Sequence, residues 1–185
     1  MNAPLQPDST EQLQHVLSLV NDWLKFAEAK NGALLIASSA IVLGLPTATT
    51  ALLLPARASA VYITWLTALA VISALLAGYS LLPRTRIPWL LPARSPEATD
   101  NLLFFGHIYS FDPDSYLIAI RAKLRQAGIP SPFERDYAEQ IVINSRITME
   151  KYVLFRAALW VLLFGALTPV LALPLLIAEA LRRRE

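Results

Sequence analysis

Polar side chains recur at helical spacing in the C-terminal third of the chain. Gln140, Asn144 and Lys151 fall on one stripe, and Ser145 and Tyr152 fall on the next, because residues three and four apart share a helix face. Amides and hydroxyls hydrogen-bond the edge of a nucleobase, and a lysine ammonium pairs with phosphate. The row could therefore bind a nucleotide. Alternatively, these residues satisfy one another between helices, and Lys151 and Tyr152 are interfacial anchors.

A second group of candidates lies in the middle of the chain. The apolar segment 102–105 is followed by His107 and then by a basic helix that carries Arg121, Lys123 and Arg125. Cations near a histidine could close over a phosphate. Alternatively, the apolar segment docks on neighbouring helices, the histidine makes an ordinary hydrogen bond, and the basic residues form a solvated face near lipid headgroups.

Lys30 stands where a charged stretch gives way to an uncharged one. Its ammonium could pair with a phosphate or a carboxylate, but the default role of lysine at such a position is to anchor a helix at the membrane surface. The chain has no cysteine and two histidines, which excludes a cysteine zinc site and a thiolate nucleophile. We expect no bound metal.

Catalytic signatures are missing as well. The sequence contains no G-x-x-x-x-G-K-[ST], G-x-G-x-x-G, H-E-x-x-H or G-x-S-x-G motif. We therefore predict that the chain is not an enzyme and carries no cofactor.

Composition indicates a membrane environment. Of the 185 residues, 55% are hydrophobic and 16% are charged, whereas a soluble domain carries about 25% charged residues. Uncharged stretches at 32–54, 58–82 and 157–178 are each long enough, at about 1.5 Å per residue, to cross a hydrocarbon core of about 30 Å. Because none holds a charged side chain, an ion-coupled transporter is disfavoured.

These stretches predict an all-α integral membrane protein with three transmembrane helices and an α-helical cytoplasmic portion. An amphipathic N-terminal cytoplasmic helix, with apolar residues at helical spacing, is expected to end before the first span. The predicted regions are an N-terminal cytoplasmic helix (1–31), a hairpin of two spans with its turn at 55–57 (32–82), a cytoplasmic helical insert (83–156), and the third span with a basic C-terminus (157–185).

Capping signals divide the insert. Asp112 followed by a proline predicts the start of a helix that stops at Gly128. Ser131, with proline next and Glu134 three residues on, predicts a capping box and a second helix. No breaker follows before residue 165, so this helix is expected to continue into the third span.

The third span contains Pro169 and Pro174, each of which removes a backbone donor and favours a kink. Three full spans are favoured over a last segment that bends back as a half-hairpin. With the N-terminus in the cytoplasm, all but four of the 16 Lys and Arg residues lie inside, which is the favoured orientation. We expect a multi-pass membrane protein.

Three segments, taken together, resemble the transmembrane effector family of Pycsar, the bacterial antiphage system built on cyclic pyrimidine mononucleotides. They are residues 26–35 (FAEAKNGALL), 102–108 (LLFFGHI) and 140–152 (QIVINSRITMEKY). In this family a carboxylate usually stands two residues before the lysine that matches Lys30, as Glu28 does, whereas Asn31 is a departure. The resemblance marks as family positions Lys30, His107, Asn144, Ser145, Lys151 and Tyr152.

The resemblance implies a partner uridylate or cytidylate cyclase that makes cyclic UMP or cyclic CMP on infection, and an effector that binds the nucleotide and impairs the inner membrane. The expected partners are the lipid bilayer and further copies of the chain, since three helices alone enclose no water path, and no nucleic acid is expected. Together with the residue patterns, the candidate ligand contacts are Lys30, His107, Arg121, Arg125, Gln140, Asn144, Ser145, Lys151 and Tyr152.

Two questions stay open at the level of sequence. The chief alternative function is a constitutive membrane-anchored interaction module without a nucleotide ligand. Cyclic UMP and cyclic CMP cannot be told apart, because exchanging O4 for N4 reverses only one hydrogen bond.

Overall fold

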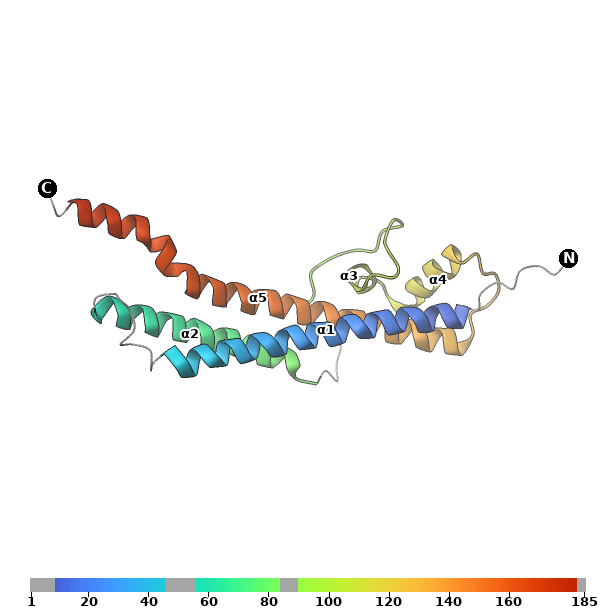
Figure 1. The fold of residues 1–185 in the computed structure, drawn as a ribbon. Coiled ribbons are helices and arrows are strands. Elements are labelled where there is room, and N and C mark those ends of the chain that lie inside the picture. The colour runs from blue at the N-terminus through green and yellow to red at the C-terminus, as the bar shows by residue number, and fades with distance from the viewer. Residues whose placement is uncertain (1–8, 46–55, 84–89, 183–185) are drawn as a thin grey trace. The chain divides into compact units, whose positions relative to one another are not determined.

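The computed structural model describes residues 9–45, 56–83 and 90–182. Within them the chain forms five helices and no strand (Figure 1). The helices are α1 (Ser9–Gly44), α2 (Ala56–Leu81), α3 (Phe105–Ile108), α4 (Pro113–Lys123) and α5 (Pro132–Arg182). Three segments are long and apolar enough to cross a membrane, namely Thr10–Gly44, Ala60–Leu81 and Pro132–Thr168. The predicted all-α class with three candidate spans is confirmed.

The chain divides into two compact units. The first, which we call the bundle unit, consists of Met1–Ala29 and Leu82–Val153. The second, the span unit, consists of Lys30–Leu81 and Leu154–Glu185. Helices α1 and α5 each contribute to both units without interruption.

The span unit packs α1, α2 and α5 through small and apolar side chains. Leu34, Ala77 and Ala158 are buried together, and the buried hydroxyls of Ser38 and Ser73 form a hydrogen bond of 3.0 Å between α1 and α2. Small residues allow close approach of helices in lipid, where burial of apolar surface gives no driving force.

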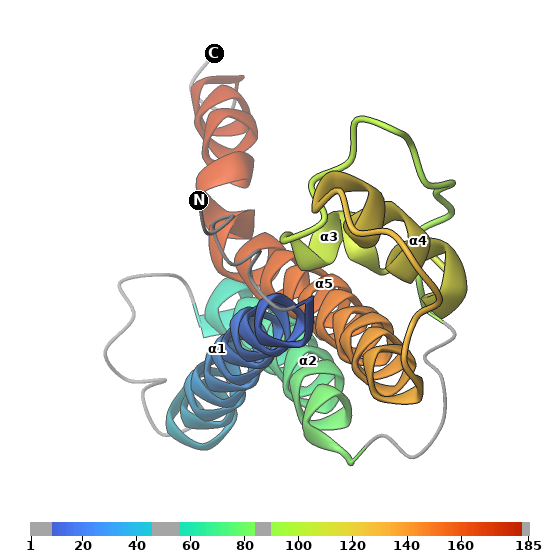
Figure 2. The same ribbon diagram turned by 90° about the vertical axis from the view of Figure 1, so that its right-hand side faces the viewer.

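The bundle unit has a separate apolar core, with α3 and α4 lying along the N-terminal part of α5 (Figure 2). Tyr116 is fully buried, and its hydroxyl donates to the carbonyl of Leu102 at 3.0 Å. Burial raises the pKa of this phenol well above its ordinary value. The core residues are Leu13, Val16, Val20, Leu102, Ile108, Phe111, Tyr116, Leu117, Ile120, Ala138, Ile141 and Val142.

Both predicted helix starts of the insert are confirmed. The carboxylate of Asp112 caps α4 by accepting the backbone N–H of Ser115 at 3.1 Å. Hydrogen bonding to the side chain of Ser115, followed by that to its backbone, lowers the pKa of Asp112. At α5, the N–H of Ser131 donates to Glu134 Oε2 at 2.7 Å, and the N–H of Glu134 donates to Ser131 Oγ at 3.2 Å. These reciprocal bonds define the capping box.

Several predicted boundaries were wrong. The N-terminal helix was expected to end at residue 31 before a separate span, but α1 continues to Gly44. Gly32 costs about 1 kcal/mol in a helix interior, too little to break a helix supported by packing on both sides. Helix α4 ends at Lys123, ahead of Gly128, because Arg125 adopts a left-handed conformation with a φ of 55°. The short helix α3 was not predicted.

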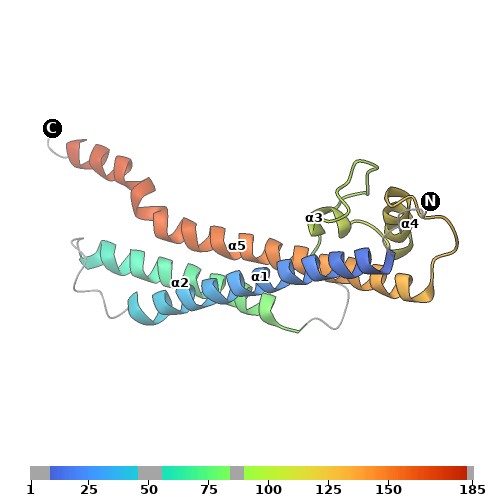
Figure 3. The same ribbon diagram turned by 45° about the vertical axis from the view of Figure 1, so that its right-hand side comes forward.

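The second span begins earlier than expected, whereas the third agrees with the favoured prediction of a full span. The turn was predicted at 55–57, but Ala56 already begins α2, while Pro55 lies outside the described residues. Helix α5 runs to Arg182 rather than bending back as a half-hairpin. Its last part changes direction in Figure 3, as expected for a helix that contains two prolines.

Candidate functional site

Helices α1 and α5 of the bundle unit meet along a line of paired polar side chains, which we call the polar seam. The side-chain amide of Asn144 donates to Asn21 Oδ1 at 2.8 Å, and Gln140 donates to Asn144 Oδ1 at 2.7 Å. Toward the C-terminal side, Lys151 Nζ lies 3.3 Å from Glu28 Oε1. The polar seam thus joins the two helices that continue into the span unit.

The pairs of the polar seam keep a constant register. Asn21 and Glu28 are seven residues apart on α1, and their partners Asn144 and Lys151 are seven apart on α5. Equal steps in the same direction mean that the helices run parallel here. A seven-residue repeat with a paired asparagine is the arrangement by which parallel coiled coils specify register at some cost in stability.

Lys151 is the most unusual member of the seam. Its side chain is 3% exposed, whereas that of its partner Glu28 is 50% exposed. A buried ammonium requires a counter-charge, because desolvation of an uncompensated ion costs several kcal/mol. Glu28 supplies this charge from the solvent side, which is also the side from which another anion could approach.

The interior beside the seam is polar as well. Ser145 is fully buried, and its hydroxyl makes no hydrogen bond to any part of the chain that the structure describes. Thr148 is fully buried and donates to the carbonyl of Asn144 at 2.7 Å. An unsatisfied buried hydroxyl costs about 1–3 kcal/mol, so Ser145 stabilises the packing of α5 less than the buried apolar Ile141 does.

His107 and Tyr152 belong to a group of aromatic rings around α3. The ring of Tyr152 stacks on Phe105 at 5.2 Å, and the ring of His107 lies edge-on to Phe104 at 5.4 Å. His107 Nδ1 accepts the backbone N–H of Asn101 at 2.9 Å. In the neutral imidazole this bond places the proton on Nε2.

The segment that precedes α3 is organised by Asp100, whose side chain is nearly buried. Its carboxylate accepts hydrogen bonds from the guanidinium of Arg94 and, at 2.9 Å, from the backbone N–H of Glu97. The Arg94 contact, followed by the backbone bond, holds the pKa of Asp100 below its ordinary value. Lys123 donates to the Asp100 carbonyl at 2.7 Å, which ties α4 to the same segment.

The remaining predicted site residues have other surroundings. Arg121 donates to Glu134 Oε1 at 2.5 Å and to the carbonyls of Ala127 and Gly128 at 3.2 Å each. Arg121 therefore joins α4 to the start of α5. Arg125 is exposed in its left-handed turn. Lys30 belongs to the span unit, where its ammonium lies 5.7 Å from the ring centre of Phe155.

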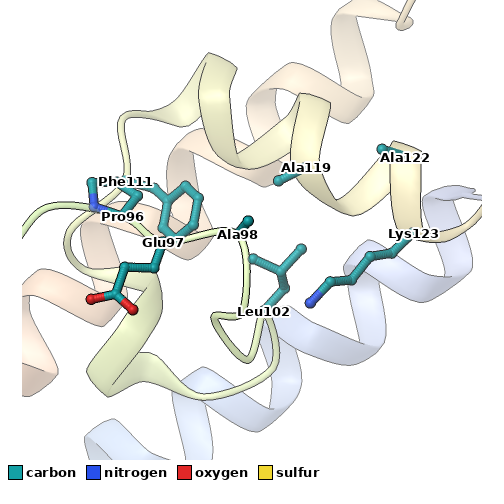
Figure 4. A pocket seen from close by; sticks show the side chains of 8 residues that line it. All are labelled: Pro96, Glu97, Ala98, Leu102, Phe111, Ala119, Ala122 and Lys123. Atoms are coloured by element: carbon teal, nitrogen blue, oxygen red, sulfur yellow. The ribbon is translucent and has the colours of Figure 1, made fainter.

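A groove of about 410 Å³ lies between the segment that precedes α3 and helix α4 (Figure 4). Apart from Glu97 and Lys123, its lining is apolar, and none of the nine candidate ligand contacts lines it. The lining residues are Pro96, Glu97, Ala98, Leu102, Phe111, Ala119, Ala122 and Lys123.

The structure therefore divides the predicted site. Gln140, Asn144 and Lys151 come together on the polar seam, while His107 and Tyr152 pack around Phe105. Asn21 was missed, although its seven-residue spacing from Glu28 matches that of Asn144 and Lys151. No group of three or more His, Asp or Glu side chains that could hold a metal occurs among residues 9–45, 56–83 and 90–182.

Three apolar helices joined to a helical bundle define a multi-pass membrane protein. Comparison of the sequence with known families gives a match to the Pycsar effector protein domain, PycTM, over residues 12–178. A relative, the Pycsar effector protein PtPycTM of Propioniciclava tarda, is 30% identical over 148 residues, which cover 78% of this chain and 69% of the relative. No solved structure matches.

The chain belongs to the Pycsar effector family, and the resemblance seen in the sequence is confirmed. It is therefore a membrane effector of antiphage defence.

Proposed function

We propose that a cyclic pyrimidine mononucleotide, cyclic UMP or cyclic CMP, activates this effector by binding at the polar seam, and that the activated protein impairs the bacterial inner membrane and stops growth. The partner cyclase supplies the nucleotide in the cytoplasm, so the proposal places the N-terminus and the bundle unit there. The observation that supports it most is the seam itself, where polar pairs join two helices that both continue into the span unit.

The seam offers groups for both ends of a nucleotide. Asn144 and Lys151 are seven residues apart, about 10 Å along a helix, which is comparable with the length of a mononucleotide. In the proposed complex the cyclic phosphate takes the place of the Glu28 carboxylate beside Lys151, and the base lies at the Asn21–Asn144 pair. A side-chain amide presents an oxygen acceptor and an N–H donor, so it suits O4 of uracil as well as N4 of cytosine.

Replacement of Glu28 supplies the differential binding that activation requires. A ligand shifts an equilibrium only if it binds one arrangement better than the other, and a change from 1:99 to 99:1 needs about 5.5 kcal/mol of preference. The nucleotide gains the buried ammonium of Lys151 only in the arrangement in which Glu28 has left it. Release of Glu28 removes one link between α1 and α5 and lets the spans change their tilt or association.

Membrane damage also requires more than one chain. Three helices do not enclose a water-filled path, so the proposal includes self-association in the bilayer. Small residues on α1 and α2, such as Ala40, Gly44 and Ala74, permit the close helix contacts that such assembly needs.

The test combines calorimetry with dye release from liposomes that contain the full chain. We expect cyclic UMP or cyclic CMP to bind and to release dye, and purine nucleotides to do neither. Lys151→Ala removes the phosphate partner and is expected to lose binding and release. Lys123→Ala, a lysine of the groove, is the matched control and is expected to retain both.

Glu28→Gln has the opposite expected effect. Without the carboxylate there is no anion to displace, so nucleotide affinity rises or dye escapes without nucleotide. If no nucleotide produced heat or release, the interaction-module alternative would be favoured. Loss of binding in Lys123→Ala, with retention in Lys151→Ala, would instead move the site to the groove.

A further inference from the structure

Three exposed aromatic side chains of the bundle unit, together with Leu103 beside one of them in the chain, form a surface that we call the aromatic patch. Trp23 and Phe26 lie on α1, whereas Leu103 and Phe104 lie just before α3, and each of the four is 38–49% exposed. The Trp23 ring lies edge-on to Phe26 at 6.3 Å and to Phe104 at 6.5 Å. Isolated exposed apolar residues are ordinary, but a contiguous patch marks contact with another molecule or with a membrane.

The aromatic patch is held firmly by the bundle unit. The ring of Trp23 also lies 5.6 Å from the buried Phe105, and the rings of Phe104 and Phe105 are 4.8 Å apart. A Cβ atom at Gly106 would lie 2.5 Å from Phe104 Cε1 and 2.8 Å from Phe104 Cζ. Glycine at this position therefore lets the Phe104 ring lie against the backbone of α3.

The position of the patch along α1 points to the membrane surface. Phe26 precedes Gly32, where the uncharged stretch begins, by six residues, or about 9 Å of helix. The headgroup layer extends about 5–8 Å beyond each side of the hydrocarbon core. A helix tilt of about 20–40° from the bilayer normal, ordinary for spanning helices, reduces 9 Å of helix to about 7–8 Å along the normal. Lys25 and Lys30 bracket Phe26, and lysine and tryptophan are both typical of this layer.

We propose that the aromatic patch inserts into the headgroup layer of the bilayer that holds the spans. The partner is lipid, because the patch is continuous along α1 with a segment that enters the membrane and combines aromatic rings with flanking lysines. Insertion holds α3, whose Phe105 stacks on Tyr152 of α5, near the membrane surface. This contact does not depend on the proposed nucleotide site.

The test places a reporter in the patch of the full chain, which has no cysteine of its own. Leu103→Cys is labelled with a small environment-sensitive fluorophore and reconstituted into phosphatidylethanolamine–phosphatidylglycerol vesicles. We expect a blue-shifted emission that is quenched by lipids with a nitroxide close to the headgroup, and weakly by aqueous iodide. Ile118→Cys, an exposed position of α4 in the same unit, is the control and is expected to show the reverse pattern.

A second variant tests the geometry of the patch. Gly106→Ala displaces the Phe104 ring, whose contacting atoms are the far end of a side chain, and should weaken lipid quenching at position 103 while the helix content is retained. Equal lipid quenching at positions 103 and 118 would overturn the proposal. It would also be overturned if the probe at 103 were open to iodide and became shielded only on addition of cyclic UMP or cyclic CMP, because the patch would then be a surface for the base.

Discussion

Arg121 and Arg125 stand four residues apart in a basic stretch, yet their surroundings differ. Arg121 is largely buried against Glu134, whereas Arg125 is exposed. Removing one partner of a buried ion pair costs about 3–5 kcal/mol, and an exposed substitution stays within about 0.5 kcal/mol. We expect Arg121→Ala to lower the free energy of unfolding by about 3–5 kcal/mol. Arg125→Ala should lower it by no more than about 0.5 kcal/mol.

Circular dichroism of the purified chain in detergent during thermal unfolding measures this difference. Equal midpoints for the two variants would show that the Arg121–Glu134 pair does not hold α4 to α5.

The Asp100 carboxylate is expected to contribute a pH dependence. Its pKa is lowered in the folded chain from the ordinary value of 3.8, so the stability that it contributes is present above that value and is lost as the pH falls through the lower folded pKa. Asp100→Asn should therefore be less stable at neutral pH and should lose less stability on acidification. Thermal unfolding from about pH 6 to about pH 2.5 measures both effects. Asp136→Asn, at an exposed position of α5, is the control and should behave as the unaltered chain does.

At the scale of elements, the contact between α1 and α5 combines two kinds of packing. Near the start of α5, Leu13 and Val16 pack against Ile141 and Val142, and burial of such side chains contributes about 1.5–3 kcal/mol each. Further along, the contact is made by the polar seam. The apolar end holds the two helices together, while the polar end is the part that the nucleotide is proposed to rearrange.

Replacing the asparagine pair tests this division. In Asn21→Leu or Asn144→Leu alone, the remaining amide loses its partner, and we expect a loss of about 1–3 kcal/mol. The double variant joins two leucines and should be about 1–3 kcal/mol more stable than the unaltered chain, and by a larger margin more stable than either single variant. It should also respond weakly to nucleotide, since the seam is then apolar. Thermal unfolding and dye release, measured for the two single variants and the double variant, complete a double-mutant cycle. If the losses of stability in the single variants simply added in the double variant, the assigned pairing of Asn21 with Asn144 would be wrong.

At the scale of the whole molecule, the described residues contain three candidate spans. An odd number of full spans places the two ends of a chain on opposite sides of the membrane. The continuous helix α5 reaches Arg182, so the proposed cytoplasmic N-terminus places the C-terminus on the opposite side of the membrane. The basic C-terminal residues then lie outside, against the general excess of Lys and Arg on the cytoplasmic side.

Cysteine labelling of intact cells tests this topology in a chain that has no cysteine. Glu185→Cys is expected to react with a membrane-impermeant thiol reagent from outside. Glu97→Cys, in the bundle unit, should react only after the cells are opened. Protection of both positions in intact cells would mean that the two ends of the chain lie on the same side.

The sequence by itself determined the class of the protein and most of its helices. Uninterrupted apolar stretches identify spans because their preference for hydrocarbon depends on composition and length and requires no knowledge of the packing. The capping residues Asp112, Ser131 and Glu134 were equally readable, since they act on backbone groups within one turn. The ordered combination of three short segments was enough to suggest the family.

Only the tertiary structure decided which polar residues meet. Asn21 and Asn144 are 123 positions apart, and nothing local indicates their pairing, because it depends on the register of two packed helices. The same holds for Lys151, whose burial under Glu28 separates it from an ordinary interfacial lysine, and for Arg121, whose partner lies on the next helix. Side-chain type and spacing are properties of one helix, whereas desolvation and pairing arise only where two helices meet.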